Sequence, residues 1–551
     1  MTNGLLLWAD DEMELLRAHL LFLEKKGYEV VTVTNGTDAI EECRKRTFDL
    51  VLLDEMMPGI SGLETLQHIK EIAPQTPVVM VTKSEEEDIM NQAIGQQIAD
   101  YLIKPVNPNQ ILLTLKKNIH RREIVTETVQ AGYQQQFQQL SMQIMDCRTW
   151  QDWTDVYKRL VRWELELSQT ESQMTEMLDM QKQEANRGFA KFIKQNYMDW
   201  IRRYEGTGAR GYENSTNAKG NLAPSPSRTP TPPILSPDIF KTKIFPLLPS
   251  AEGRLQGKDD GEKVFLVVLD NFRYDQWKML EGELADQFLI DEDLYCSILP
   301  TATQYARNAI FSGLMPVQIE KMFPDLWVDE DEEEGKNLNE EPLIRTQLER
   351  YRRKNTFSYH KINTSTDADR FMQQLNALAK NDLNVVVFNF IDMLSHARTE
   401  SKMVRELANN ESAYRSITLS WFRHSVISDL FRQLAQSDYR VIITTDHGSI
   451  RANNPVKIVG DRNTNTNLRY KLGKNLGYDS KDLFVIKDPH KAMLPAPNLS
   501  TSYVFATGDD FFAYPNNYNY YVSYYRNTFQ HGGISMEEMI IPIITLKGKK
   551  R

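Results

Sequence analysis

Three acidic side chains follow two short apolar runs near the N-terminus. Asp10 and Asp11 come directly after LLLWA, and Asp54 ends LVLLD. We expect these runs to be neighbouring parallel strands, whose carboxyl ends would bring the three carboxylates into one pocket. Three carboxylates repel one another, and a hard divalent cation with oxygen ligands relieves that repulsion. The pattern therefore predicts a Mg²⁺ site formed by Asp10, Asp11 and Asp54.

Two further polar residues end the next apolar runs. Thr82 ends VVMVT, and Lys104 follows DYLI. A hydroxyl and an ammonium that face a carboxylate–Mg²⁺ centre suit an aspartyl phosphate, because its anionic oxygens need cationic and hydrogen-bond-donating partners. The five residues together predict a phosphorylation site.

Residues 1–120 resemble the receiver domain of bacterial response regulators. The acid pair, DEMMPGISGLE around Asp54, VTKS at Thr82 and YLIKP at Lys104 occur in the order of that family. The resemblance implies a CheY-like doubly wound fold and phosphorylation of Asp54 by a sensor histidine kinase. It also implies that Tyr101 is the switch aromatic, acting with Thr82 and Lys104.

A second constellation combines carboxylates and imidazoles in the C-terminal half. Asp270 ends an apolar run. Asp392 and His396 lie in FIDMLSH, Asp446 and His447 in TTDHG, and His531 in HGG. Three carboxylates and three imidazoles provide the oxygen and nitrogen ligands that suit zinc, in a number that suits two Zn²⁺ ions. The alternative is that they are separate polar caps of unrelated strand ends.

A nucleophile is expected in LPTATQYARNAIFSG, residues 299–313. Thr301 and Thr303 lie there at a predicted strand-to-helix transition, where backbone N–H groups and the helix dipole favour a phosphate. Zinc coordination lowers the pKa of a hydroxyl, and a pair of metal ions holds the attacking and leaving oxygens in line. The residues alone leave the choice between the two threonines open.

The order of Asp270, PTxT, DxxxH, DHG and HGG resembles the alkaline phosphatase superfamily over about residues 260–546. Within that superfamily, these motifs are close to those of the nucleotide pyrophosphatase/phosphodiesterase branch and of PglZ domains. The resemblance implies an alkaline-phosphatase-like α/β domain. It implies that one zinc is bound by Asp270, Thr303, Asp446 and His447. It implies that the other zinc is bound by Asp392, His396 and His531.

The phosphodiesterase branch has PTxTxPN, in which the second threonine is the nucleophile. This favours Thr303 over Thr301. The chain has PTATQYARN, without the proline and without the asparagine three residues after the nucleophile. Arg307 or Asn308 is therefore expected to contact the substrate in place of that asparagine.

Two observations bear on the substrate. The chain has no CxPxR segment, which argues against a sulfatase, and two Zn²⁺ balance three aspartates and a threonine alkoxide, which favours a monoanionic diester over a dianionic monoester. Upstream of His531, the tyrosine-rich run at 511–527 is either a stacking platform for nucleobases or an edge strand. Nucleotide or oligonucleotide diesters, linear or cyclic, are the expected substrates.

Periodicity predicts the elements that position these residues. Residues 1–120 alternate apolar runs with helical spacing, as a doubly wound α/β domain does, and residues 121–205 read as an all-α helical bundle. Residues 206–236 are rich in Gly, Ser, Pro and Asn and predict a flexible linker or loop. Residues 237–551 alternate strands and helices again, so we expect a multidomain α/β protein.

Composition narrows the class of protein. The 551 residues include 65 Lys and Arg against 75 Asp and Glu, which gives a net charge of −10. This charge argues against a broad, non-specific surface for binding nucleic acids or membranes. The three cysteines are far apart, which excludes a disulfide framework. The N-terminus lacks signal-peptide character, and no apolar run approaches the length of a membrane span. We expect a cytoplasmic protein without membrane insertion.

A receiver, a helical bundle and a PglZ-like domain in one chain are similar to PorX-type response regulators, which are associated with type IX secretion in Bacteroidetes. The resemblance implies a zinc-dependent phosphodiesterase that phosphorylation of Asp54 controls through a homodimer. The alternative is a regulator that binds transcription machinery or secretion components, with the metal domain as a scaffold. Residues 120–205 contain no helix-turn-helix or basic recognition stretch, which argues against direct DNA binding.

Overall fold

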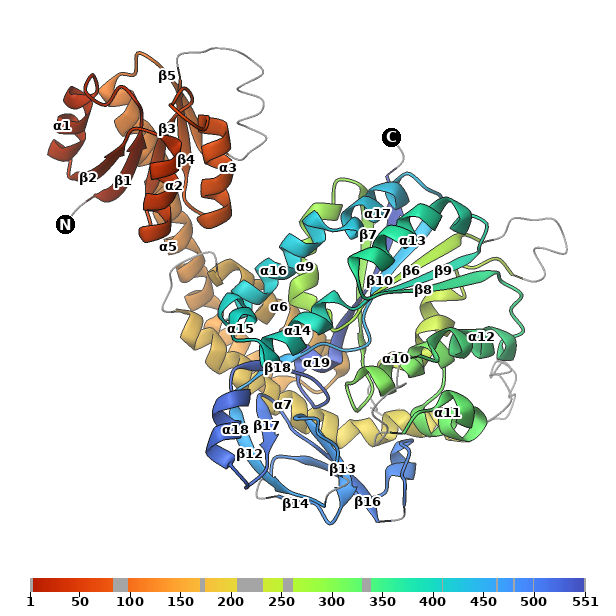
Figure 1. Cartoon of the computed structure of the whole chain (residues 1–551). Coiled ribbons are helices and arrows are strands. Elements are labelled where there is room, and N and C mark those ends of the chain that lie inside the picture. Colours follow the sequence, from red (N-terminus) through yellow and green to blue (C-terminus); the bar gives the residue numbers. More distant parts are fainter. Residues whose placement is uncertain are drawn as a thin grey trace. The chain divides into compact units, whose positions relative to one another are not determined.

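The computed structural model (Figure 1) describes the chain except residues 1–2, 83–97, 169–173, 206–230, 251–260, 330–337, 409, 462–463, 479–480, 499 and 550–551. The side chains of residues 82, 120–127, 398–400 and 402 are also outside the description. The chain forms two compact units. Unit 1 contains residues 1–137 and 166–175, and unit 2 contains residues 138–165 and 176–551.

Unit 1 contains a five-stranded parallel sheet with the order β2-β1-β3-β4-β5. The strands are β1 (Gly4–Ala9), β2 (Tyr28–Val33), β3 (Leu50–Asp54), β4 (Val78–Thr82) and β5 (Asp100–Ile103). Continuous apolar runs are typical of parallel strands that helices cover on both faces. The five strands predicted from the sequence are confirmed, and the adjacency of β1 and β3 brings their carboxyl ends together.

Helices cover both faces of this sheet. They are α1 (Arg17–Lys25), α2 (Gly36–Lys45), α3 (Gly62–Ile72) and the first part of α5 (Pro108–Asp146). Leu23 of α1 and Ile111 and Leu115 of α5 belong to the core on one face. Residues of α2 and α3, including Ile40 and Leu66, belong to the core on the other face. The arrangement is the doubly wound fold expected from the sequence.

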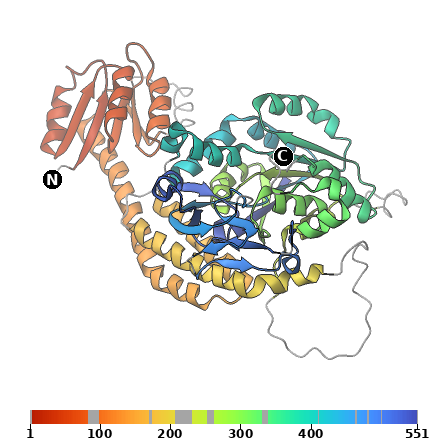
Figure 2. The ribbon, with the colours of Figure 1, turned by 60° about the horizontal axis from the view of Figure 1, so that its bottom comes forward.

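Three long helices follow the sheet of unit 1: α5, α6 (Trp150–Ser168) and α7 (Met174–Ile201). Because α5 runs unbroken from residue 108 to residue 146, the expected boundary at residues 120/121 falls inside a helix. Within unit 2, Trp153 of α6 packs against Phe189 and Phe192 of α7. Figure 2 shows α7, in yellow, lying along the blue C-terminal segment, and Asn186 donates a hydrogen bond to Glu537 there.

Unit 2 is built on a six-stranded sheet with the order β7-β19-β10-β6-β9-β8. Strands β10, β6, β9 and β8 are parallel, and β19 is antiparallel to both β10 and β7. The strands are β6 (Lys263–Leu269), β7 (Phe288–Cys296), β8 (Phe357–Ile362), β9 (Leu383–Phe388), β10 (Tyr439–Thr444) and β19 (Ile540–Gly548). The three adjacent parallel strands β10, β6 and β9 therefore end at one edge, where ligands bind in open α/β sheets.

Helices surround this sheet, and the described helices beyond α7 are α9 (Tyr274–Leu284), α10 (Thr303–Ser312), α11 (Pro316–Met322), α12 (Glu340–Arg350), α13 (Ser365–Leu378), α14 (Phe390–Glu400), α15 (Lys402–Leu407), α16 (Glu411–His424), α17 (Val426–Ala435), α18 (Tyr518–Tyr525) and α19 (Met536–Met539). Small sheets are formed by β11 (Ile450–Ala452), β12 (Asn454–Val459), β13 (Tyr470–Lys474), β14 (Gly477–Tyr478), β15 (Phe484–Ile486), β16 (Thr501–Phe505), β17 (Asp510–Ala513) and β18 (Thr528–Gln530). Within the described residues, no helix has the length and apolarity that a membrane crossing requires.

Two regions differ from the sequence-based expectations. In the tyrosine-rich run, residues 511–513 belong to the edge strand β17, but the cluster of tyrosines at 518–525 forms helix α18. In the predicted linker, residues 206–230 lie outside the described residues, whereas Leu235 and Ser236 are fully buried and Leu235 forms a bridge with Cys296. The apolar Leu235 anchors this end, so the packed part of unit 2 begins before residue 237.

Candidate functional site

The carboxyl ends of β1 and β3 bring together the three acids of unit 1. Ligand oxygens of Asp10, Asp11 and Asp54 lie within 4.8 Å of one another. Lys104 Nζ, from the residue after β5, lies 2.7 Å from Asp10 Oδ2 and 3.0 Å from Asp54 Oδ2. Burial raises the pKa of Asp54, and the Lys104 ammonium opposes that effect. The cluster thus offers oxygen ligands for a hard cation and one ammonium for an anionic group on Asp54.

The other predicted members of this site occupy β4 and β5. Thr82 ends β4, where the backbone pairs with Ile103, and its side chain lies outside the described residues. Tyr101 is half-buried and packs against the core formed with α2 and α3. Sequence reasoning missed Glu55, which is buried beside Asp54, and burial raises its pKa to about 6.

The first predicted zinc cluster lies at the ends of β6 and β10. Ligand atoms of Asp270, Asp446 and His447 lie within 4.8 Å of one another, and all three side chains are buried. His447 Nε2 is 3.9 Å from Asp270 Oδ1 and 3.8 Å from Asp446 Oδ2. Asp270 Oδ1 is buried and has no hydrogen-bond partner among the described residues. Burial, with repulsion from Asp446 and Asp392, raises the pKa of Asp270 to about 7.

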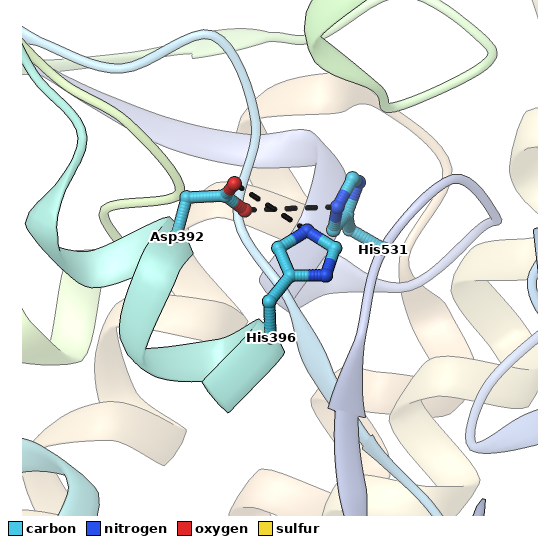
Figure 3. A group of neighbouring side chains, drawn as sticks. All are labelled: Asp392, His396 and His531. Atoms are coloured by element: carbon cyan, nitrogen blue, oxygen red, sulfur yellow. Dashed lines mark ion pairs between the residues drawn. The ribbon is translucent and has the colours of Figure 1, made fainter. Parts of the chain in front are cut away.

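The second predicted zinc cluster is shown in Figure 3. Asp392 and His396 lie one turn apart on α14, and His531 follows β18. Asp392 Oδ2 is 3.4 Å from His396 Nε2, and Asp392 Oδ1 is 3.7 Å from His531 Nε2. We expected Asp392 at a strand end, but it lies in the first turn of the helix that follows β9. Asn271, two residues after the end of β6, donates a hydrogen bond to Asp392 Oδ1 at 3.2 Å.

The imidazoles of His447 and His531 are oriented as metal ligands. Each Nδ1 lies beside a backbone carbonyl, Gly448 O at 3.2 Å and Thr301 O at 3.1 Å. A carbonyl only accepts hydrogen bonds, so Nδ1 carries the proton and Nε2 presents its lone pair. Burial lowers the pKa of both imidazoles, that of His531 to about 4, so both are neutral at pH 7.

These lone pairs face carboxylate oxygens, which are also acceptors. Such opposed acceptors are stabilised by a cation between them, and nitrogen with oxygen donors suits Zn²⁺. The rings of His447 and His531 are stacked with centroids 4.2 Å apart, so the two clusters are adjacent. The nitrogen and oxygen donors, the unpartnered Asp270 Oδ1 and the short distance between the two clusters together fit a pair of metal ions.

The two candidate nucleophiles have different environments. Thr303 is the first residue of α10, and its Oγ1 lies 3.1 Å from His447 Nε2. Thr301 is fully buried; its Oγ1 donates to Gly533 O at 2.9 Å and accepts from Gly532 N at 3.0 Å. The Thr301 hydroxyl thus holds the HGG turn, whereas the Thr303 hydroxyl faces the first cluster.

Arg307 and Asn308 were expected to contact the substrate, and the structure places them differently. Arg307 is 0 % exposed and forms ion pairs with Asp270, with Asp446 at 3.1 Å and with Glu340 at 3.2 Å. Its guanidinium therefore holds the carboxylates of the first cluster from inside the protein. Asn308 is also buried. Both follow Thr303 on α10, and the helix turns them into the core.

Sequence reasoning also missed a buried ion pair next to the turn at residues 531–533, the HGG motif. Arg469 and Glu538 are fully buried, and Arg469 Nη2 lies 2.7 Å from Glu538 Oε2. Glu538 Oε1 accepts a hydrogen bond from Gly533 N at 2.8 Å. A methyl group on Gly533 would lie 2.6 Å from Ala506 O, so the close approach of the backbone requires glycine here. No local motif reveals this pair, because its members are distant in sequence.

Comparison with known families agrees with this geometry. A family model described as the BREX system PglZ alkaline phosphatase-like domain matches residues 240–546, more than half of the chain. The chain belongs to the PglZ family. Models of the PorX response regulator linker domain and of the response regulator receiver domain match residues 123–201 and 6–116. The three matches together are those of a PorX-type response regulator.

Curated relatives match about a fifth of the chain. The transcriptional regulatory protein ResD of Bacillus subtilis (strain 168) is 34% identical over 116 residues, which are 21% of this chain and 48% of ResD. The transcriptional regulatory protein ZraR of Klebsiella oxytoca is 34% identical over 132 residues, 23% of this chain and 30% of ZraR. The chain spans about half or less of the length of these two relatives.

A solved CheY-like receiver domain protein from Methanospirillum hungatei JF-1 is 26% identical, with a TM-score of 0.21, and the match covers 22% of this chain and 95% of that one. A receiver domain implies phosphorylation by a sensor kinase, and such domains bind Mg²⁺. Alkaline phosphatase-like domains typically bind metal ions, and the PglZ match indicates a hydrolase of the phosphatase superfamily.

Proposed function

We propose that this chain is a response regulator phosphorylated on Asp54 whose output domain is a zinc-dependent phosphodiesterase. The observation that carries the proposal is the position of Thr303 at the start of α10, where its Oγ1 lies 3.1 Å from His447 Nε2. A hydroxyl at a helix N-terminus and beside two clusters of metal-ligating side chains suits attack on a phosphate.

Seven residues would hold two zinc ions. Asp270, Thr303, Asp446 and His447 would hold one ion, and Asp392, His396 and His531 would hold the other. Bound zinc would supply Lewis-acid stabilisation of the developing charge and would lower the pKa of a coordinated hydroxyl. Asn271 and Arg307 fix the orientation of the carboxylates through their hydrogen bonds and ion pairs.

Thr303 performs the covalent chemistry in this proposal. The Thr303 hydroxyl loses its proton to solvent, its Oγ1 forms a bond to phosphorus as the bond to the leaving alkoxide breaks, and the alkoxide takes a proton from solvent. Water then attacks the phosphothreonine diester, which releases a phosphomonoester and returns the threonine hydroxyl. The first backbone N–H groups of α10 stabilise negative charge on the transferred phosphoryl group.

The charge of the site supports a diester substrate. Among the metal-binding groups themselves, the four positive charges of two Zn²⁺ balance three aspartates and the Thr303 alkoxide. A neutral centre accommodates one negative charge more easily than two. We infer that the substrates are nucleotide-type phosphodiesters, linear or cyclic.

The test is hydrolysis of a chromogenic phosphodiester and of the matching monoester by the zinc-loaded full chain. We expect faster turnover of the diester, loss of activity with retained zinc in Thr303→Ala, and loss of both in His396→Ala. A wild-type protein that binds two zinc ions but hydrolyses neither ester would refute the enzymatic proposal. It would support the alternative of a scaffold that binds transcription or secretion proteins.

Regulation is proposed to act through phosphorylation of Asp54 by a sensor histidine kinase in the cytoplasm, with a link to type IX secretion. We infer that phosphorylation favours a homodimer, because the receiver fold is followed directly by long helices that can transmit a change near Tyr101. Light scattering with and without a phosphoryl mimic measures this. An unchanged mass would place the switch within one chain.

A further inference from the structure

Helix α18 has an unusual composition for a surface element. Five of the eight residues in YNYYVSYY are tyrosines, yet none of the eight is buried. Tyr518, Val522 and Tyr525 form the inward stripe, which packs partly buried against Ala452, Phe511 and Ala513. This stripe accounts for the attachment of the helix and for two of its tyrosines.

The remaining tyrosines, Tyr520, Tyr521 and the half-buried Tyr524, lie outside that stripe. Tyr520 is 64% exposed and Tyr521 is 37% exposed. The rings of Tyr520 and Tyr524 are nearly parallel, at 15° with centroids 6.1 Å apart, and Tyr521 lies edge-on to Tyr520 at 5.3 Å. A solvent-facing helical face ordinarily carries charged or small polar residues. Here it carries a contiguous aromatic face, formed by Tyr520, Tyr521 and Tyr524.

The electrostatic surroundings of this aromatic face favour an anion. The guanidinium of Arg405, on α15, lies 5.1 Å from the centroid of the Tyr524 ring. The chain averages one Asp or Glu in about seven residues, but residues 511–536 contain none. An aromatic surface with a cation over one ring and no acid in its own segment is suited to nucleobases joined by phosphates.

The two helices at the aromatic face, α18 and α15, are neighbours in sequence of the segments that carry the second metal cluster. Helix α18 is followed by β18 and then by His531, and α15 follows α14, which carries Asp392 and His396. Strand β18 contacts α14 (Figure 1). Seven residue steps separate Tyr524 from His531, so the aromatic face begins within about 25 Å of the cluster along the chain.

We infer that the aromatic face of α18 stacks the bases of a single-stranded nucleic acid whose scissile phosphodiester lies at the metal clusters. The inference rests on the proposed diesterase function and adds to it a base-dependent binding surface. Stacking is tolerant of sequence, so the surface would select single strands with bases over duplexes and over base-free diesters, without selecting a sequence.

The experiment measures binding without hydrolysis. Full-length Thr303→Ala protein is titrated with labelled oligodeoxythymidine of about eight nucleotides and with an abasic strand of the same length. Tyr520→Ser or Tyr524→Ser is expected to weaken oligodeoxythymidine binding about tenfold, within the range measured for loss of one stacking ring. Tyr520→Phe and Tyr524→Phe keep the ring and are expected to keep the affinity. Binding of the abasic strand is expected to change little, and zinc content, measured in the same preparations, to be unchanged.

Equal affinity for the two strands, or no effect of Tyr520→Ser and Tyr524→Ser, would overturn the inference. A change of molecular mass in these variants, with unchanged oligonucleotide affinity, would instead assign the face to a contact with a second copy. Because no turnover is involved, a wild-type protein that binds the strand through these tyrosines but hydrolyses no diester would refute the proposed function alone.

Discussion

Removing the hydroxyl of Thr301 and removing that of Thr303 are expected to have opposite consequences. In Thr301→Val, Gly532 N loses its acceptor and Gly533 O loses its donor, and both backbone groups are buried. Each buried group left unpaired costs about 1–3 kcal/mol, so the free energy of unfolding falls by about 2–6 kcal/mol. In Thr303→Val, one hydrogen bond to His447 at a half-buried position is lost, which costs about 1 kcal/mol or less.

The loss of catalytic activity is expected to be larger in Thr303→Val than in Thr301→Val, which is the reverse of the order for stability. Thr303→Val lacks the attacking oxygen and loses on the order of a thousandfold or more in kcat, while it retains its zinc. Thr301→Val affects turnover only through the position of His531, whose Nδ1 contacts the carbonyl of residue 301. Thr301→Ser retains both hydrogen bonds and is the matched control.

Urea unfolding, zinc content and diester hydrolysis, measured on the same preparations, test this pair. A Thr303→Val protein destabilised as much as Thr301→Val would show that Thr303 is the structural residue. An inactive but fully stable Thr301→Val would show that the nucleophile is two residues earlier than assigned.

Three further expectations concern other parts of the chain. Asp54→Ala is expected to abolish labelling by acetyl phosphate, because this carboxylate ends β3 beside Lys104, and persistent labelling would place the acceptor elsewhere. Burial and neighbouring carboxylates raise the pKa of Asp510 to about 6, so stability falls as the pH rises from about 4 to about 6. Asp510→Asn should therefore be more stable than wild type by about 1–3 kcal/mol at pH 7.5 and equal to it near pH 4, as thermal unfolding at both pH values would show. Arg469→Met should destabilise unit 2 by about 3–5 kcal/mol in urea unfolding, because it leaves Glu538 buried and unpaired, and Arg469→Met/Glu538→Gln should recover part of the loss.

The metal-ligating residues could be predicted where a local pattern places them. Asp270 and Asp446 follow long apolar runs, and such runs identify parallel strands and the edge at which they end. Asp392 could be assigned to the same edge but not to its helix, because NVVVFNFID remains apolar past the last residue of β9. The spacing of Asp392 and His396 is one helical turn, which is consistent with their positions on α14.

The supporting residues could not be predicted, because their roles depend on contacts between distant segments. Arg307 reads as an exposed cation near the nucleophile, but the sequence does not show that α10 packs its face onto the carboxylates of β6 and β10. The tyrosines of α18 have high β-propensity, yet Tyr518, Val522 and Tyr525 pack with helical spacing against Phe511. Packing thus decides the burial of Arg307 in the first case and the helical conformation of the tyrosines in the second.

The most direct test of the account is a zinc titration of the metal-stripped full chain, with diester hydrolysis as the readout. Two adjacent clusters of ligands predict that activity returns only as the second equivalent of zinc is added, and that Asp392→Asn, which disables one cluster, stays inactive with one equivalent bound. Hydrolysis that survives complete removal of metal, or that is fully restored by a single equivalent, would contradict the dinuclear zinc phosphodiesterase.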